Sequence, residues 1–136
     1  MIRGSCLCGC VKFEITGAIL SPRYCHCSNC RKFSGTAYAA WGLAQSSEFK
    51  VTGEEGVTKY DSGAGLRVFC SSCGSPLWYE PSHLPQYRGI PLGALDGDAP
   101  EPQMHVWIKS KAPWALIEDH LPQHETHPGA HDQAAR

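Results

Sequence analysis

Hydrophobic and polar residues alternate along several short segments of the chain, a pattern typical of β-strands with one buried face. The clearest case is Cys10–Thr16, in which Val11, Phe13 and Ile15 would share one face and charged residues the other. Similar short runs predict strands at 38–43, 49–52, 57–60, 66–69, 76–79 and 105–109. The pattern therefore predicts a mainly β fold made of short strands.

One segment without alternation, Cys27–Gly35, predicts a single helical turn. Ser28 is a residue type that caps helix N-termini, and the turn would carry Cys30, Arg31 and Lys32. This places cysteines at the start of a helix.

Glycine and proline divide the predicted strands. Four glycines fall between or beside the runs as turn candidates: Gly53, Gly63, Gly65 and Gly74. Residues 81–102 hold five of the ten prolines and predict a long irregular crossing. Within it, Gly93–Asp96 is expected to form a short strand or a turn.

The length of 136 residues fits one domain, and 14 glycines with 10 prolines argue against a bundle of long helices. We expect the domain to span residues 1–123. Residues 124–136 read as a flexible polar tail, and we assign no function to its histidines at 124, 127 and 131.

Charge and hydropathy exclude some partners. The formal net charge is −1, and lysine and arginine are scattered without the basic stripe that binds a phosphate backbone, so we expect no nucleic acid partner. The first residues contain no apolar signal core, and no stretch has the roughly 20 apolar residues that span a bilayer. We expect a cytoplasmic protein with no membrane partner, and the sequence leaves open whether it forms a homo-oligomer.

Eight cysteines point to metal rather than disulfides, because a disulfide framework needs an oxidising compartment and the chain shows no export signal. Seven of them fall in three tight groups, Cys6-Leu-Cys8, Cys25-His-Cys27-Ser-Asn-Cys30 and Cys70-Ser-Ser-Cys73. Cysteines one or two residues apart can direct both sulfurs at one ion. Thiolates select zinc or an iron–sulfur cluster, and we expect zinc.

The seven thiols divide most simply into four plus three. If the strands that adjoin the first and last groups pair, one closed structural site forms from Cys6, Cys8, Cys70 and Cys73. A local triplet then remains with a vacant fourth position: Cys25, Cys27 and Cys30. An open position is what separates catalytic from structural zinc, because substrate must reach the ion.

The same motifs carry a family resemblance over about residues 4–123. The motifs are Gly4-Ser-Cys-Leu-Cys-Gly, Cys25-His-Cys-Ser-Asn-Cys-Arg-Lys, Phe69-Cys-Ser-Ser-Cys-Gly, Gly93-Ala-Leu-Asp, His105-Val-Trp and Ala112-Pro-Trp. Together they resemble the glutathione-dependent formaldehyde-activating enzyme family, also called centromere protein V-like. The resemblance implies a single-domain β-tent fold with two zinc ions per chain, the four-cysteine set structural and the three-cysteine set catalytic.

The resemblance also implies an activity: a carbon–sulfur lyase-type enzyme that joins a thiol such as glutathione to formaldehyde or a related small aldehyde. The zinc would hold the thiol as thiolate, although it could instead polarise the aldehyde oxygen. A non-catalytic binding module with both metals structural is the alternative. That reading would be favoured if Cys10 or His26 completed the second site.

Five further residues have a functional and an ordinary interpretation. Cys10 is expected to be a small surface residue, and His26 to coordinate no metal. Arg31 and Lys32 are candidate cations for the second site. Among the tryptophans, Trp41 is the candidate for a ligand pocket, and the others are expected in the core.

Overall fold

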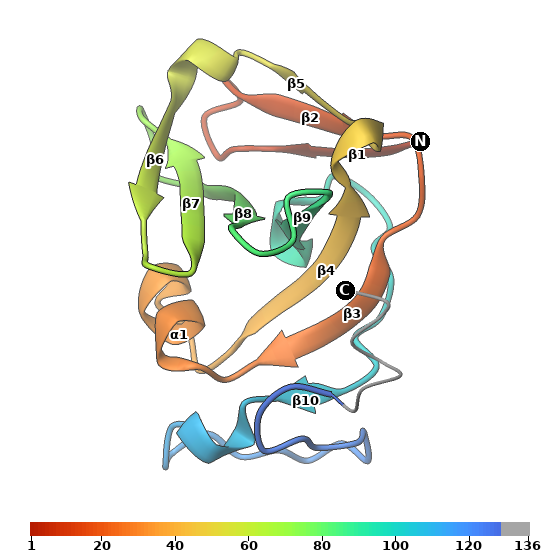
Figure 1. Ribbon diagram of the computed structural model, residues 1–136, viewed down its shortest axis with the longest axis vertical. Coiled ribbons are helices and arrows are strands. Elements are labelled where there is room, and N and C mark those ends of the chain that lie inside the picture. The colour runs from red at the N-terminus through yellow and green to blue at the C-terminus, as the bar shows by residue number, and fades with distance from the viewer. Residues whose placement is uncertain (129–136) are drawn as a thin grey trace.

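The computed structural model describes residues 1–128 (Figure 1). Most of the predicted tail, including His131, lies outside the described residues. The described part forms two sheets, one short α-helix and four short 3-10 helices. The strands are β1 (Ile2–Ser5), β2 (Lys12–Ile15), β3 (Leu20–Cys25), β4 (Ala39–Gln45), β5 (Phe49–Thr52), β6 (Val57–Asp61), β7 (Gly65–Cys70), β8 (Pro76–Pro81), β9 (Tyr87–Pro91) and β10 (His105–Val106).

The smaller sheet has the order β1-β2-β5 and the larger one the order β10-β3-β4-β9-β8-β7-β6. Every pairing is antiparallel except that of β10 with β3, which is parallel. In Figure 1 the smaller sheet lies across the top, and the larger one extends from β6 and β7 on the left to β10 at the bottom. The predicted mainly β, single-domain fold is confirmed.

The alternating run around β2 lies as expected. Val11, Phe13 and Ile15 are buried with at most 1% of their surface exposed, and Phe13 stacks on Phe49 of the neighbouring β5 at 5.2 Å. Gly4 stands opposite Phe13 on β1, and a Cβ there would collide with the Phe13 ring. The hydrophobic faces of the two sheets meet in one core, which includes Trp78, Leu77 and Ile90 of the larger sheet.

Two predictions, one about the long crossing and one about a glycine turn, are wrong. The crossing at 81–102 is not irregular throughout, because β9 lies within it and pairs with both β4 and β8. Gly93–Asp96 lies at a 3-10 helix (Leu92–Ala94), and Leu95 forms an isolated bridge to Gly4. Gly65 is no turn residue, since it begins β7 and lies against the backbone of Glu80.

The predicted strand at 105–109 is also too long. Only His105 and Val106 pair with β3, because Trp107 adopts a left-handed backbone with φ 60° and a 3-10 helix (Ile108–Ser110) follows. Residues 124–126 lie beside this segment. The N–H of His124 donates to the His105 carbonyl at 2.9 Å, and that of Trp107 donates to the Thr126 carbonyl at 3.0 Å.

A domain end at residue 123 stays a prediction. Within residues 1–128, no helix is both long and apolar enough to cross a membrane.

Candidate metal centres and active-site pocket

Four cysteines gather where the two sheets approach each other. Cys6 and Cys8 lie in the turn between β1 and β2, Cys70 ends β7, and Cys73 lies in the turn before β8. Their four sulfurs all lie within 4.8 Å of one another. The Sγ–Sγ distance is 3.6 Å between Cys6 and Cys8 and 3.7 Å between Cys8 and Cys70.

The turns, rather than paired strands, bring these sulfurs together. We expected the two adjoining strands to pair, but β2 and β7 belong to different sheets. In the second turn Gly74 has φ 76° and donates its N–H to the Cys70 carbonyl. The Leu7 N–H of the first turn donates to the Ser75 hydroxyl at 2.9 Å, which joins the two turns directly.

Backbone and hydroxyl donors point at the sulfurs of this cluster. The Val11 N–H donates to Cys6 Sγ at 3.3 Å. Hydrogen bonds from the Ser75 hydroxyl and backbone lower the pKa of the Cys73 thiol to about 5. Such donors stabilise a thiolate over a thiol, and the thiolate is the form that binds metal.

The second group is built on the connection from β3 to α1 (Ser28–Ser34). Cys25 ends β3, Cys27 is the residue that caps the helix, and Cys30 lies in its first turn. The Cys30 N–H donates to Cys27 Sγ at 3.3 Å, so the cap is Cys27 and not Ser28 as predicted. The helix ends at Gly35, whose backbone is left-handed with φ 69°.

The three sulfurs of this second group lie within 4.8 Å of one another. The thiols are hydrogen-bonded, and contacts with Cys25 and Cys30 lower the pKa of Cys27. The same contact with Cys27 raises the pKa of Cys25. Cys27 therefore ionises before Cys25, and a bound cation would favour ionisation of all three.

Either cluster could hold a metal ion, because each converges several sulfurs on one small volume. All eight cysteines are free thiols. Within residues 1–128, neither Cys10 nor His26 belongs to a group of potential metal ligands. Cys10 is exposed, whereas His26 is fully buried and directs Nε2 toward another histidine.

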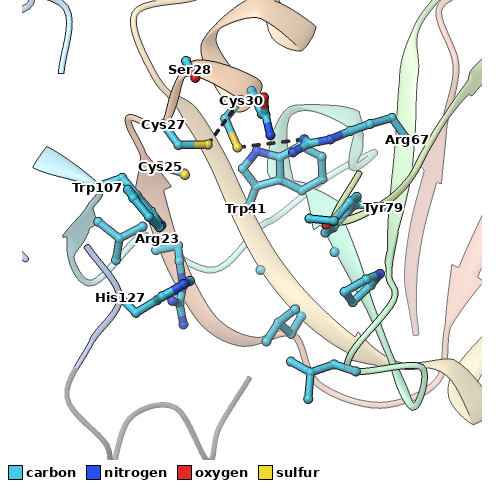
Figure 2. A pocket seen from close by; sticks show the side chains of 18 of the residues that line it. Arg23, Cys25, Cys27, Ser28, Cys30, Trp41, Arg67, Tyr79, Trp107 and His127 are labelled. Carbon is cyan, nitrogen blue, oxygen red and sulfur yellow. Dashed lines mark hydrogen bonds between the residues drawn. The ribbon is translucent and has the colours of Figure 1, made fainter. Parts of the chain in front are cut away.

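The three-cysteine group lines a pocket of about 390 Å³ (Figure 2). The predicted Trp41 lines it too, with its ring buried beside the sulfurs. Trp107, which we expected in the core, and Tyr79 also face this space. The pocket therefore brings three aromatic rings and the three thiols to one space.

Two buried arginines line the same pocket, Arg23 from β3 and Arg67 from β7, each only 6% exposed. Arg67 Nη1 donates to Cys30 Sγ at 3.9 Å. Within the described chain it is the only guanidinium hydrogen-bonded to one of these three sulfurs. Within the described residues, Arg31 and Lys32 of α1 make no such bond. The cation beside the sulfurs is therefore Arg67 of β7.

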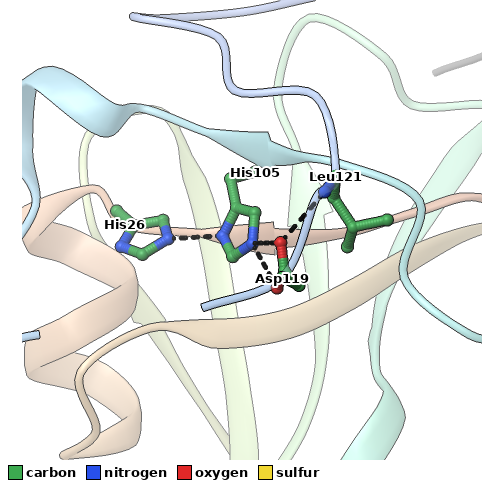
Figure 3. Close-up of polar contacts among 4 residues, drawn as sticks. All are labelled: His26, His105, Asp119 and Leu121. Atoms are coloured by element: carbon green, nitrogen blue, oxygen red, sulfur yellow. Dashed lines mark hydrogen bonds and ion pairs between the residues drawn. The ribbon is translucent and has the colours of Figure 1, made fainter. Parts of the chain in front are cut away.

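A chain of polar contacts runs from His26, which lies between two of the three cysteines, through His105 to Asp119 (Figure 3); both histidines are fully buried and Asp119 is exposed. His26 Nε2 lies 2.9 Å from His105 Nδ1, and His105 Nε2 lies 2.9 Å from a carboxylate oxygen of Asp119. Burial, and then the neighbouring His105, lower the pKa of His26 to about 4, so this ring is neutral at pH 7. The Asp119 carboxylate can only accept when ionised, so His105 Nε2–H donates to it, and one N–H joins His105 Nδ1 to His26 Nε2.

Sequence reasoning missed Arg67, His105 and Asp119. A charged residue inside the apolar run 66–69 was a signal for the first of them. His105 stood in one of the motifs that carry the resemblance, but nothing local indicated its partners: the parallel pairing of β10 with β3 brings it to His26, and Asp119 joins it from a loop.

Comparison with known proteins adds the family. The model of the family described as glutathione-dependent formaldehyde-activating enzyme matches residues 1–110. The chain belongs to this family. The match spans both cysteine groups and both pocket arginines, and it ends before Asp119.

The chain is also similar to individual proteins and to a solved structure. A protein of Halomonas elongata that carries the provisional name glutathione-dependent formaldehyde-activating enzyme is 32% identical over 128 residues, or 87% of this chain and 82% of its own. An uncharacterized lyase of Schizosaccharomyces pombe is 32% identical over 79 residues, or 56% of this chain and 55% of its own. A crystal structure of a Rhodobacter sphaeroides protein has 29% sequence identity and a TM-score of 0.60, covering 72% of this chain and 91% of that one.

Membership of the formaldehyde-activating family and the lyase name of one relative support an enzyme with formaldehyde-activating or lyase activity.

Proposed function

We propose that the protein joins a thiol, glutathione being the first candidate, to formaldehyde or a related small aldehyde, giving an S-hydroxymethyl thiol adduct. One observation carries the proposal: the three-cysteine group, and not a four-ligand set, opens onto the aromatic pocket. Three protein ligands leave a position for a substrate. The family name supports glutathione and formaldehyde as the reactants.

Zinc is the metal that we propose for both groups. Tetrahedral zinc has Zn–S bonds of about 2.3 Å, which sets neighbouring sulfurs about 3.8 Å apart. The Sγ–Sγ distances of 3.6 Å and 3.7 Å in the four-cysteine group fit this value. Cys6, Cys8, Cys70 and Cys73 would hold a structural ion, and Cys25, Cys27 and Cys30 the second.

When bound at the second group, zinc would supply a Lewis acid that keeps the substrate thiol deprotonated near pH 7. The reaction then forms one C–S bond. The electron pair of the carbonyl π bond moves to the aldehyde oxygen, and that oxygen takes up a proton, which balances the proton lost by the thiol.

The pocket residues would orient the reactants. The rings of Trp41, Trp107 and Tyr79 line the space beside the sulfurs and would exclude water from it. The guanidinium of Arg23, also in the lining, suits a carboxylate at a distance from the thiol, and glutathione carries two carboxylates.

A non-catalytic module with two structural metals is the less favoured function. It would need a fourth protein ligand at the second group, and neither Cys10 nor His26 supplies one within the described chain. His26 is committed to its hydrogen bond with His105.

Calorimetry can test the proposal on the zinc-loaded protein. Glutathione titrated in buffers of different ionisation enthalpy should release a proton below the thiol's own pKa, whereas S-methylglutathione should release none. Turnover with formaldehyde is then measured above the uncatalysed rate, because thiols add to formaldehyde unaided. Binding of glutathione without proton release, together with no rate above background, would refute the proposed reaction.

A further inference from the structure

We infer that Arg67 is the counter-charge of the three-cysteine site, a positioning residue that holds the site's metal–thiolate charge and the incoming thiolate. The inference rests on the proposed function for the identity of that thiolate. The contact between Arg67 and Cys30 is independent of the proposed function.

The burial of Arg67 needs an anion to offset it. Arg67 is only 6% exposed, and within residues 1–128 no carboxylate forms an ion pair with it. An unpaired buried charge costs several kcal/mol, so buried cations are normally found beside anions. The sulfur of Cys30, 3.9 Å from Arg67 Nη1, fills that role once the cysteine is ionised.

Aromatic rings fix the position of this guanidinium. Its central carbon lies 4.5 Å from the ring centroid of Tyr79, 5.6 Å from that of Phe33 and 5.8 Å from that of Trp41. The three rings come from β8, α1 and β4, and Tyr79 stands opposite Arg67 in the β7–β8 register. Ring faces attract the cation without using its N–H donors.

These ring contacts leave N–H donors of Arg67 available for hydrogen bonds. Arg67 Nε is buried and has no hydrogen bond partner within the described residues. An arginine has five N–H groups, and the contact with Cys30 involves one nitrogen. Arg67 also lines the pocket, so its remaining donors lie beside the space that a substrate would enter.

The charge of the site explains why a cation is required. A divalent ion with three thiolates carries one net negative charge, and a substrate thiolate would raise it to two. The positive charge of Arg67 offsets one of these negative charges. We therefore expect the site to bind an anionic ligand, such as a thiolate, more tightly than a neutral thioether of the same shape.

Substitutions that remove the charge provide the test. Arg67→Met and Arg67→Gln remove it, and Arg67→Lys keeps it. Arg88→Met is the matched control, because Arg88 also stacks on two rings, Phe49 at 4.7 Å and Trp78 at 5.4 Å, but does not line the pocket. Circular dichroism establishes that each variant is folded, and the second neutral variant stands in if the first fails to fold.

Zinc itself is the first probe, with the affinity of the second site measured by chelator competition. The neutral variants should lose about 10- to 100-fold in affinity at this site, as when a group supporting a metal ligand is removed. Arg67→Lys should lose less, and Arg88→Met should match the wild type. Neutral variants that bind the second zinc as tightly as Arg88→Met would overturn the inference.

Glutathione and S-methylglutathione are the second probes, and they separate the inference from the proposed function. A wild type that binds both equally would contradict the proposed thiolate binding, whatever the zinc result. A wild type that prefers glutathione, with the preference unchanged in Arg67→Met, would overturn the role of Arg67 alone. The expected result is a wild-type preference that falls at least about tenfold in Arg67→Met and stays in Arg88→Met.

Discussion

Replacing His105 by alanine should destabilise the protein strongly, although His105 does not line the pocket. The ring is fully buried between His26 and Asp119, and it stacks on Tyr24 with centroids 4.9 Å apart. Its removal leaves Nε2 of His26 buried without its hydrogen-bond partner. This single loss costs about 1–3 kcal/mol.

The lost stacking on Tyr24 adds about 0.5–1.5 kcal/mol. We therefore expect His105→Ala to lower the free energy of unfolding by about 3 kcal/mol, a large fraction of the roughly 5–15 kcal/mol of a typical domain. Asp119→Asn should cost less, because the amide oxygen of asparagine can still accept the hydrogen bond from His105.

The assay is urea unfolding of the zinc-loaded protein, followed by tryptophan fluorescence and circular dichroism. His120→Ala is the control, since this neighbouring histidine is exposed and its loss should stay within about 0.5 kcal/mol. If His105→Ala costs less than about 1 kcal/mol, or no more than His120→Ala, the buried chain does not stabilise the fold and the reasoning is wrong.

Three further predictions concern the metal groups and acid stability. Cys70→Ser should yield unfolded or insoluble protein, because structural zinc contributes on the order of 10 kcal/mol to folding; a soluble variant with a wild-type melting temperature would contradict this. Cys27→Ser should keep the fold and lose the second equivalent of zinc in metal analysis, because its site closes only a short local loop; two full equivalents would show the opposite. Burial alone would raise the pKa of Glu80, but hydrogen bonds from Trp78 and Lys59 outweigh it and lower the pKa below 4.5. Glu80 therefore stabilises the fold above pH 4.5, and this stability is lost as the pH falls through the folded-state pKa. Glu80→Gln should therefore flatten the acid limb of the stability profile, and an unchanged limb would count against the sign.

The sequence predicted strands whose residues alternate or are rich in β-formers, and it missed β1, β3 and β9. β2 and β5 alternate and were predicted nearly to the residue. β9 carries a glycine and ends at a proline, and β3 contains Pro22, so neither shows a period-two pattern. Their place in the sheet depends on neighbours distant in sequence, which local composition does not report.

The cysteine groups were accessible from spacing because ligands of one ion cluster in sequence. The division into four and three thiols agrees with the sulfurs that the fold brings together, but the expected reason, pairing of the adjoining strands, is wrong. The pocket cation was sought at Arg31 and Lys32 because they are adjacent in sequence. Arg67 reaches Cys30 from a strand 37 residues later, a distance that no local motif bridges.

The parallel pairing of β10 with β3 also orders events during synthesis. A chain leaves the ribosome from its N-terminus, so the four sulfurs of the closed group are all present once Cys73 has emerged. The three-cysteine loop has emerged by then too, but Val106, Trp107 and His127, which complete the pocket wall, have not. The nascent chain thus passes through a stage in which the three thiols have been made but the part of the pocket wall that Val106, Trp107 and His127 form has not.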